Sequence, residues 1–122
     1  MPFRSQADLL GDILASITEI DQIVAGLDLP ALRSDRLRKL AVERLFQILT
    51  EAATRLGDDA SLVCPSINWR DIRGMGNWLR HAYEQVDDSV LWAAIEDDLP
   101  PLKTAVSHAL AELAQVSRRS QP

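Results

Sequence analysis

The sequence predicts an all-α up-and-down bundle of four to five helices. Apolar residues recur at steps of three and four through almost every segment, which is the period of a helix with one buried face. No segment shows the apolar–polar alternation of a half-buried strand. The chain has 122 residues, of which 47% are hydrophobic, and this suits one packed core. We therefore expect a single domain over residues 1–122, with residues 117–122 as a flexible polar tail.

The first helix is predicted from about Ser5 to Ala25. Gly26 is a suitable C-terminal cap, because glycine readily adopts the left-handed conformation that ends many helices. A connection follows, with one short helical turn after Pro30. The apolar stripe of the first helix consists of Leu9, Leu10, Ile13, Leu14, Ile17, Ile20 and Val24.

The second helix is predicted from about Asp35 to Leu56. Ser34 is the expected N-cap, and Gly57 ends the helix. The following stretch, from Asp58 to Asn68, is rich in turn-forming residues and is predicted to be a loop. The expected inner face of this helix consists of Leu37, Leu40, Leu45, Ile48, Leu49, Ala52, Ala53 and Leu56.

The third helix is predicted from about Trp69 to Tyr83. The next begins after an N-cap at Asp87 or Asp88, and its apolar stripe continues almost to the end of the chain. Pro100 and Pro101 interrupt that stripe. Because proline removes a backbone donor and clashes with the preceding turn, we expect a kink or break near Asp98. Stripes this continuous on so small a bundle favour burial against a second copy, so we expect a homodimer.

Charge and composition narrow the function classes. The net charge is −5, whereas a protein that only coats nucleic acid is usually basic. The segment from Arg33 to Arg55 nevertheless holds six bases against three acids, so a local surface can attract phosphates. No apolar run is long enough to span a bilayer and no secretory signal is visible, so we expect a cytoplasmic protein without membrane contact. No cysteine or histidine cluster suggests a metal, and we expect no cofactor.

The most chemically able group of side chains is Asn77, His81 and Tyr83. Asn77 and His81 are four residues apart, which places them one turn apart on one helix face, and Tyr83 follows near the helix end. An imidazole passes protons in both directions near neutral pH, which suits cleavage of an RNA phosphodiester. The alternative is that each residue is structural or merely exposed. The residues alone leave both alternatives open.

The run from Trp69 to Tyr83 resembles the HepT-like toxins of the HEPN superfamily. In that family Trp and Ile open the helix, and Gly-Met-Arg-Asn, Leu, His and Tyr follow. Upstream, the segment from Ile48 to Ala53 is similar to an apolar-Gly-Glu-Ala segment of the family, with Thr50 in place of Gly. The opening residues Asp12, Ile13 and Leu14 also fit the first helix of the family. The matching residues are Trp69, Ile72, Gly74, Met75, Asn77, Leu79, His81, Tyr83, Val86, Asp87, Leu91, Trp92, Ile95, Asp98, Leu99, Pro100 and Leu102.

The resemblance implies a HEPN-like homodimer that acts as a metal-independent ribonuclease toxin through an Arg-x4-His-x-Tyr motif. It also implies a minimal nucleotidyltransferase antitoxin, which transfers AMP to the motif tyrosine. Carried over, His81 is the acid/base candidate, and Tyr83 is both a site residue and the AMP acceptor. Asn77 would position the phosphate or His81. Glu51 is a weaker candidate for the same cleft.

The chain departs from the motif at Gly76, where the family has its arginine. Loss of one preorganised donor to a charged transition state costs about 10²–10³ in rate. Arg80 and Arg73 are the available substitutes, although neither can replace the missing side chain directly from its position on the helix. Whether the chain is an enzyme is therefore open. The alternative is a weakened or inactive interaction module that still binds the nucleotidyltransferase.

Overall fold

The computed structural model describes residues 4–81 and 87–119. Within these two ranges every regular element is helical and no strand occurs. In chain order the elements are α1 (Gln6–Val24), α2 (Leu29–Ser34), α3 (Arg36–Leu56), α4 (Asp59–Val63), α5 (Trp69–His81), α6 (Asp88–Ala93), the π-helical segment η1 (Ala94–Asp98) and α7 (Leu99–Arg119).

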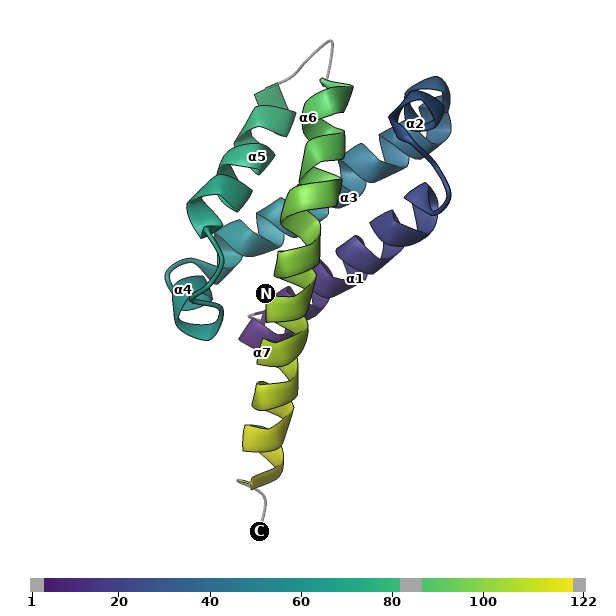
Figure 1. Ribbon diagram of the computed structural model, residues 1–122. Helices are drawn as coiled ribbons and strands as arrows, with labels where there is room; N and C mark the ends of the chain where they lie inside the picture. Colours follow the sequence, from purple (N-terminus) through teal and green to yellow (C-terminus); the bar gives the residue numbers. More distant parts are fainter. Residues whose placement is uncertain (1–3, 82–86, 120–122) are drawn as a thin grey trace.

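The described elements form the predicted all-α bundle. The helices α1 and α3 lie side by side and run in opposite directions, and α5 packs against α3. The helices α6, η1 and α7 form one long rod that crosses α1 (Figure 1). The chain therefore passes up and down through α1, α3, α5 and this rod, which confirms the predicted fold class. The short helices α2 and α4 sit at opposite ends of α3.

Side-chain caps hold the N-termini of α1 and α3. In α1, Ser5 Oγ accepts a hydrogen bond from the Asp8 amide at 3.0 Å, and Asp8 Oδ2 accepts one from the Ser5 amide at 3.2 Å. For α3 the prediction of Ser34 was wrong, because Ser34 is the last residue of α2. Asp35 caps α3 instead, and its Oδ1 accepts from the Arg38 amide at 3.1 Å.

The stretch predicted as a loop after α3 contains a short helix. Gly57 ends α3 with a φ of 59°, a conformation that favours glycine. Immediately after it, α4 forms around Ala60, which is completely buried. Turn-forming residues flank this helix and mask it in the sequence. Burial of Ala60, rather than helix propensity, accounts for its position.

The predicted break near Asp98 is replaced by a wider helical turn. Residues Ala94–Asp98 are π-helical, and the Leu99 amide donates to the carbonyl of Ala94. Pro100 and Pro101 fall in the first turn of α7, where the absence of an amide donor costs least. The rod is therefore continuous through the prolines (Figure 1). At its other end α7 extends to Arg119, so residues 117–119 of the predicted tail are helical.

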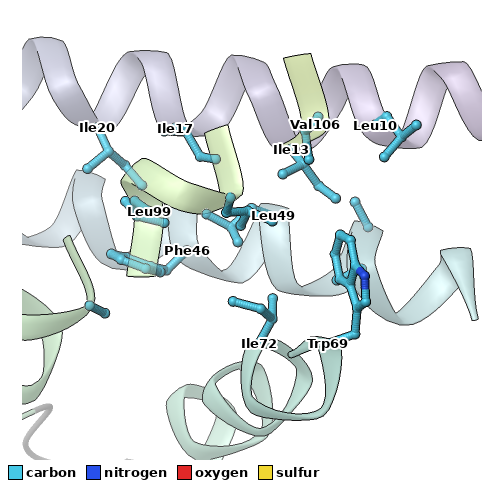
Figure 2. Packing of buried hydrophobic residues seen from close by; sticks show 14 of the residues in the cluster. Leu10, Ile13, Ile17, Ile20, Phe46, Leu49, Trp69, Ile72, Leu99 and Val106 are labelled. Atoms are coloured by element: carbon cyan, nitrogen blue, oxygen red, sulfur yellow. The ribbon is translucent and has the colours of Figure 1, made fainter. Parts of the chain in front are cut away.

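The core lies where α1, α3, α5 and α7 meet. Figure 2 shows Leu10, Ile13, Ile17 and Ile20 pointing from α1 toward α3. From the other elements the buried side chains include Phe46, Leu49, Trp69, Ile72, Leu99 and Val106 (Figure 2).

Two residues of the predicted inner face of α3 point away from this core. Leu37 is 79% exposed and Leu40 is 44% exposed, so this part of the prediction was wrong. The buried stripe of α3 passes through Phe46, nine residues after Leu37. Nine residues correspond to about 180° around a helix, which turns Leu37 to the opposite side.

Candidate functional site

The structure divides the predicted site residues between two sides of α5. Asn77 and His81 are both exposed and lie one turn apart on the helix. Gly76 is buried against α3, about 100° around the helix from Asn77. Arg80 lies one turn beyond Gly76, beside a pocket between α3 and α5. Within one chain, the Asn77–His81 pair and the pocket therefore face different directions.

Tyr83 lies outside the described residues. Its predicted roles as a site residue and as the AMP acceptor therefore stay predictions.

Helices α3 and α5 are closely packed at Gly76 and Thr50. A Cβ atom placed on Gly76 would lie 2.5 Å from Thr50 Oγ1 and 2.7 Å from Thr50 Cβ. Thr50 is only 2% exposed, and its hydroxyl donates to the Phe46 carbonyl at 2.8 Å. Because Thr50 is held on the α3 backbone, it cannot turn away cheaply. Any side chain at position 76 would therefore push the two helices apart.

The pocket between α3 and α5 has a volume of about 330 Å³ and is lined by charged and polar side chains. Arg44 Nη1 donates to Gln47 Oε1 at 3.3 Å, whereas Arg80 has no hydrogen bond or ion pair with another described residue. Glu51 pairs with Arg55 at 3.1 Å, which offsets its charge. The lining residues are Arg44, Gln47, Thr50, Glu51, Thr54, Gly76, Leu79 and Arg80.

The structure thus brings Glu51 and Arg80 of the predicted set together, and it adds Arg44. The sequence reasoning missed Arg44, although its signal was present. Arg44, Gln47, Glu51 and Thr54 follow steps of three and four, so they form one polar face of α3. That face would have indicated a polar groove opposite the motif helix.

Arg73 is engaged elsewhere. Its Nε donates to the Ala53 carbonyl at 3.3 Å, and its Nη2 donates to the Gly57 carbonyl at 2.6 Å. These bonds satisfy carbonyls at the C-terminal end of α3, where a cation is favourable to the helix dipole. Its predicted part in phosphate binding stays a prediction, and it would require at least one of these bonds to break.

A second, more open pocket of about 590 Å³ lies between α5 and the α6–η1 segment. Partial burial raises the pKa of Asp98 in its lining, and the nearby carboxylates of Asp97 and Asp71 raise it further. The apolar part of this pocket comes from Met75, Trp78 and Val90. The three-residue step from Met75 to Trp78, which places both side chains on one face of α5, is the signal for this pocket in the sequence.

The part of the chain that the structure describes contains neither a cluster of metal ligands nor a helix that could span a membrane. No three His, Cys, Asp or Glu side chains in residues 4–81 and 87–119 are placed to hold a metal ion together. None of the described helices is long and apolar enough to cross a membrane.

The described helices and the exposed Asn77 and His81 on α5 define an all-α bundle protein with a polar candidate site on one helix. Residues 13–109 match the family model described as "Ribonuclease HepT-like". The chain therefore belongs to the HepT-like ribonuclease family.

Curated relatives agree with this family. One, named "Probable ribonuclease HepT", is from Thermococcus cleftensis and is 34% identical over 100 residues, which cover 82% of this chain and 91% of the relative. Another, from Methanocaldococcus jannaschii and provisionally named an RNase, is 27% identical over 106 residues, which cover 87% of this chain and 97% of the relative. No solved structure matches the chain significantly.

Proposed function

We propose that this protein is the ribonuclease toxin of a toxin–antitoxin system and cleaves cellular RNA in the cytoplasm without a metal ion. The observation that supports this most strongly is the exposed Asn77–His81 pair, which a member of a ribonuclease family has retained at the end of α5. Both side chains are open to a large substrate such as RNA.

In the proposed reaction His81 transfers protons. The ribose 2′-hydroxyl loses a proton and its oxygen attacks the adjacent phosphorus, while the bond to the 5′-oxygen breaks and that oxygen gains a proton. One imidazole, or one from each subunit of a dimer, can serve these two steps. Asn77 is placed to donate a hydrogen bond from its amide to a phosphate oxygen or to orient His81. Tyr83 is the third residue of the proposed site, as the resemblance to the family motif implies.

A homodimer is part of this proposal. Leu37 and Leu40 on α3 and Val90 on α6 are large apolar side chains that are 79%, 44% and 47% exposed. A second copy would remove them from water. It would also bring a second set of His81 and Asn77 side chains to a shared cleft.

The proposed partner is a minimal nucleotidyltransferase antitoxin. It would neutralise the toxin by joining AMP to Tyr83: the phenolic oxygen attacks the α-phosphorus of ATP, pyrophosphate leaves, and the phenol loses its proton. A bulky anion on Tyr83, two residues from His81, would block access of RNA to the site.

The contact between Gly76 and Thr50 favours a second candidate function. Because position 76 holds no arginine, the transition state loses a cationic partner. The chain would then be a weakened or inactive module that retains binding to the nucleotidyltransferase.

Induced expression of the chain without its partner tests the two candidates. We expect growth arrest and fragmentation of total RNA from the parent, and neither from His81→Ala. The matched control is His108→Ala, since His108 is also exposed on a helix but lies on α7 beside Glu112, at 2.9 Å. A silent parent that still binds the nucleotidyltransferase and accepts AMP would replace the toxin with the inactive module. RNA cleavage that persists in His81→Ala would remove His81 from the chemistry.

A further inference from the structure

We propose that the pocket between α3 and α5 binds a phosphate of single-stranded RNA between Arg44 and Arg80, next to the phosphate that is cleaved. The proposal rests on the proposed function, and it names two positioning residues for the same site. It begins from two departures of the sequence from the family pattern. One is Thr50 in place of glycine, and the other is Gly76 in place of arginine.

These two departures are in direct contact. A Cβ atom on Gly76 would overlap Thr50, whose hydroxyl is bonded to the Phe46 carbonyl. In the family pattern that the chain resembles, the small residue of this contact lies on α3, whereas here it is Gly76 on α5. Position 76 therefore carries no cationic side chain, and the positive charge that binds a phosphate must come from other residues.

Arg44 and Arg80 are the cations nearest to this contact that line the pocket. They come from two different helices, and Arg80 has no hydrogen bond or ion pair with another described residue. No described residue occupies the donors of Arg80, and a guanidinium offers five N–H donors to phosphate oxygens. Among the described residues Arg44 donates to the neutral side chain of Gln47, at 3.3 Å, and it forms no ion pair with any of them.

The pocket has the size and charge for a phosphate. Its volume of about 330 Å³ is far more than the roughly 10–15 Å³ that one water needs, so a phosphodiester can enter. Glu51 is the carboxylate among the lining residues, and its ion pair with Arg55 reduces its repulsion of an anion. Two arginines therefore outweigh it within the pocket, although the whole chain carries a net charge of −5.

The position of Arg80 indicates which phosphate is bound. Arg80 and His81 are consecutive, and their side chains diverge by about 100° around α5. The phosphate in the pocket is therefore not the one at His81 of the same chain but a neighbour of it along the RNA. Arg44 and Arg80 hold the strand in register and do not act on the reacting atoms.

Binding of an uncleavable RNA tests this assignment. The probe is a fluorescently labelled single-stranded RNA in which 2′-O-methyl groups block cleavage, and fluorescence anisotropy gives its affinity for the full chain over a range of salt concentrations. Arg44→Gln and Arg80→Gln should each weaken binding about tenfold at low salt. Each should also reduce the slope of log K against log salt by about 0.7, as expected when one phosphate contact to a single strand is lost.

Two kinds of control make the result specific. Arg36→Gln on α3 and Arg118→Gln on α7 remove exposed arginines outside the pocket, and they should leave the slope unchanged. Arg80→Lys should keep most of the slope, because the charge remains. An unchanged slope in either Arg44→Gln or Arg80→Gln, or a parent that does not bind the probe, overturns the proposal.

The experiments distinguish a failure of the proposed ribonuclease activity from a failure of the proposed phosphate site. Since the probe cannot be cleaved, its binding does not depend on catalysis, and cleavage is measured on unmodified RNA. Arginine-dependent binding without cleavage leaves the phosphate site standing and removes the ribonuclease. Cleavage by the parent with unchanged kcat and KM in both glutamine variants leaves the ribonuclease standing and removes the phosphate site.

Discussion

The interface of α1 with α3 and that of α3 with α5 are built from different residues. Between α1 and α3, large apolar side chains meet and are completely buried, among them Ile13, Ile17 and Phe46 (Figure 2). Between α3 and α5 a glycine packs against a threonine, and a polar pocket opens beside this contact. The first interface removes apolar surface from water. The second sets the spacing of the helices that carry the site.

The α1–α3 and α3–α5 interfaces therefore tolerate different substitutions. In the α1–α3 interface the free energy depends on the apolar volume that fills the space, and loss of volume is the damaging change. In the α3–α5 interface the space is already closed, and gain of volume is the damaging change. At position 76 the gain of even one Cβ atom would overlap Thr50.

The largest expected effect is on stability and lies in the α1–α3 interface. Phe46→Ala should lower the free energy of unfolding by about 3–5 kcal/mol, because it removes a fully buried ring and leaves a cavity. Urea denaturation followed by circular dichroism measures this. Leu62→Ala on α4 is the matched control, since Leu62 is 79% exposed and should change the stability by less than about 0.5 kcal/mol. Equal losses in the two variants would contradict the assignment of the core.

A smaller effect is expected at the end of α3, where α5 is attached by a charged side chain. Arg73→Met keeps much of the length of the side chain but removes the donors to the Ala53 and Gly57 carbonyls. We expect a loss of about 1–2 kcal/mol in the free energy of unfolding. Arg70→Met, on the exposed side of α5, should change it by less than about 0.5 kcal/mol. If Arg73→Met instead leaves stability unchanged, this arginine is available for RNA.

The sequence predicted the long helices because their apolar stripes are continuous and their ends carry strong signals. Gly57 marks the end of α3 and Asp87 caps α6, as expected. The helix α4 and the π-helical turn were not predicted, because both depend on what the tertiary structure buries or widens. Leu37 was assigned to the inner face of its helix as the first residue of an apolar stripe, although it is 79% exposed.

For the site, the sequence indicated candidate residues but not their neighbours. Arg80 and Glu51 line one pocket, which does not include His81, and Arg44 was not predicted. The predicted roles of Arg80 and Glu51 stay predictions. The contact between Gly76 and Thr50 could not be predicted, since the two residues are 26 positions apart in sequence and meet only where α3 and α5 pack together.

A double-mutant cycle on Gly76 and Thr50 tests most sharply whether side chains at these two positions exclude one another. Free energies of unfolding are measured for the parent, Gly76→Arg, Thr50→Gly and the double variant. Gly76→Arg alone should lose about 1–3 kcal/mol by overpacking. Thr50→Gly should lose about 1–2 kcal/mol, mainly because a buried side chain is removed and partly because glycine has a lower helix propensity. The double variant should be more stable than the sum predicts, with a coupling energy of about 1–3 kcal/mol. Additivity within about 0.5 kcal/mol would show that the two positions do not exclude one another, and the account of the missing arginine would be wrong.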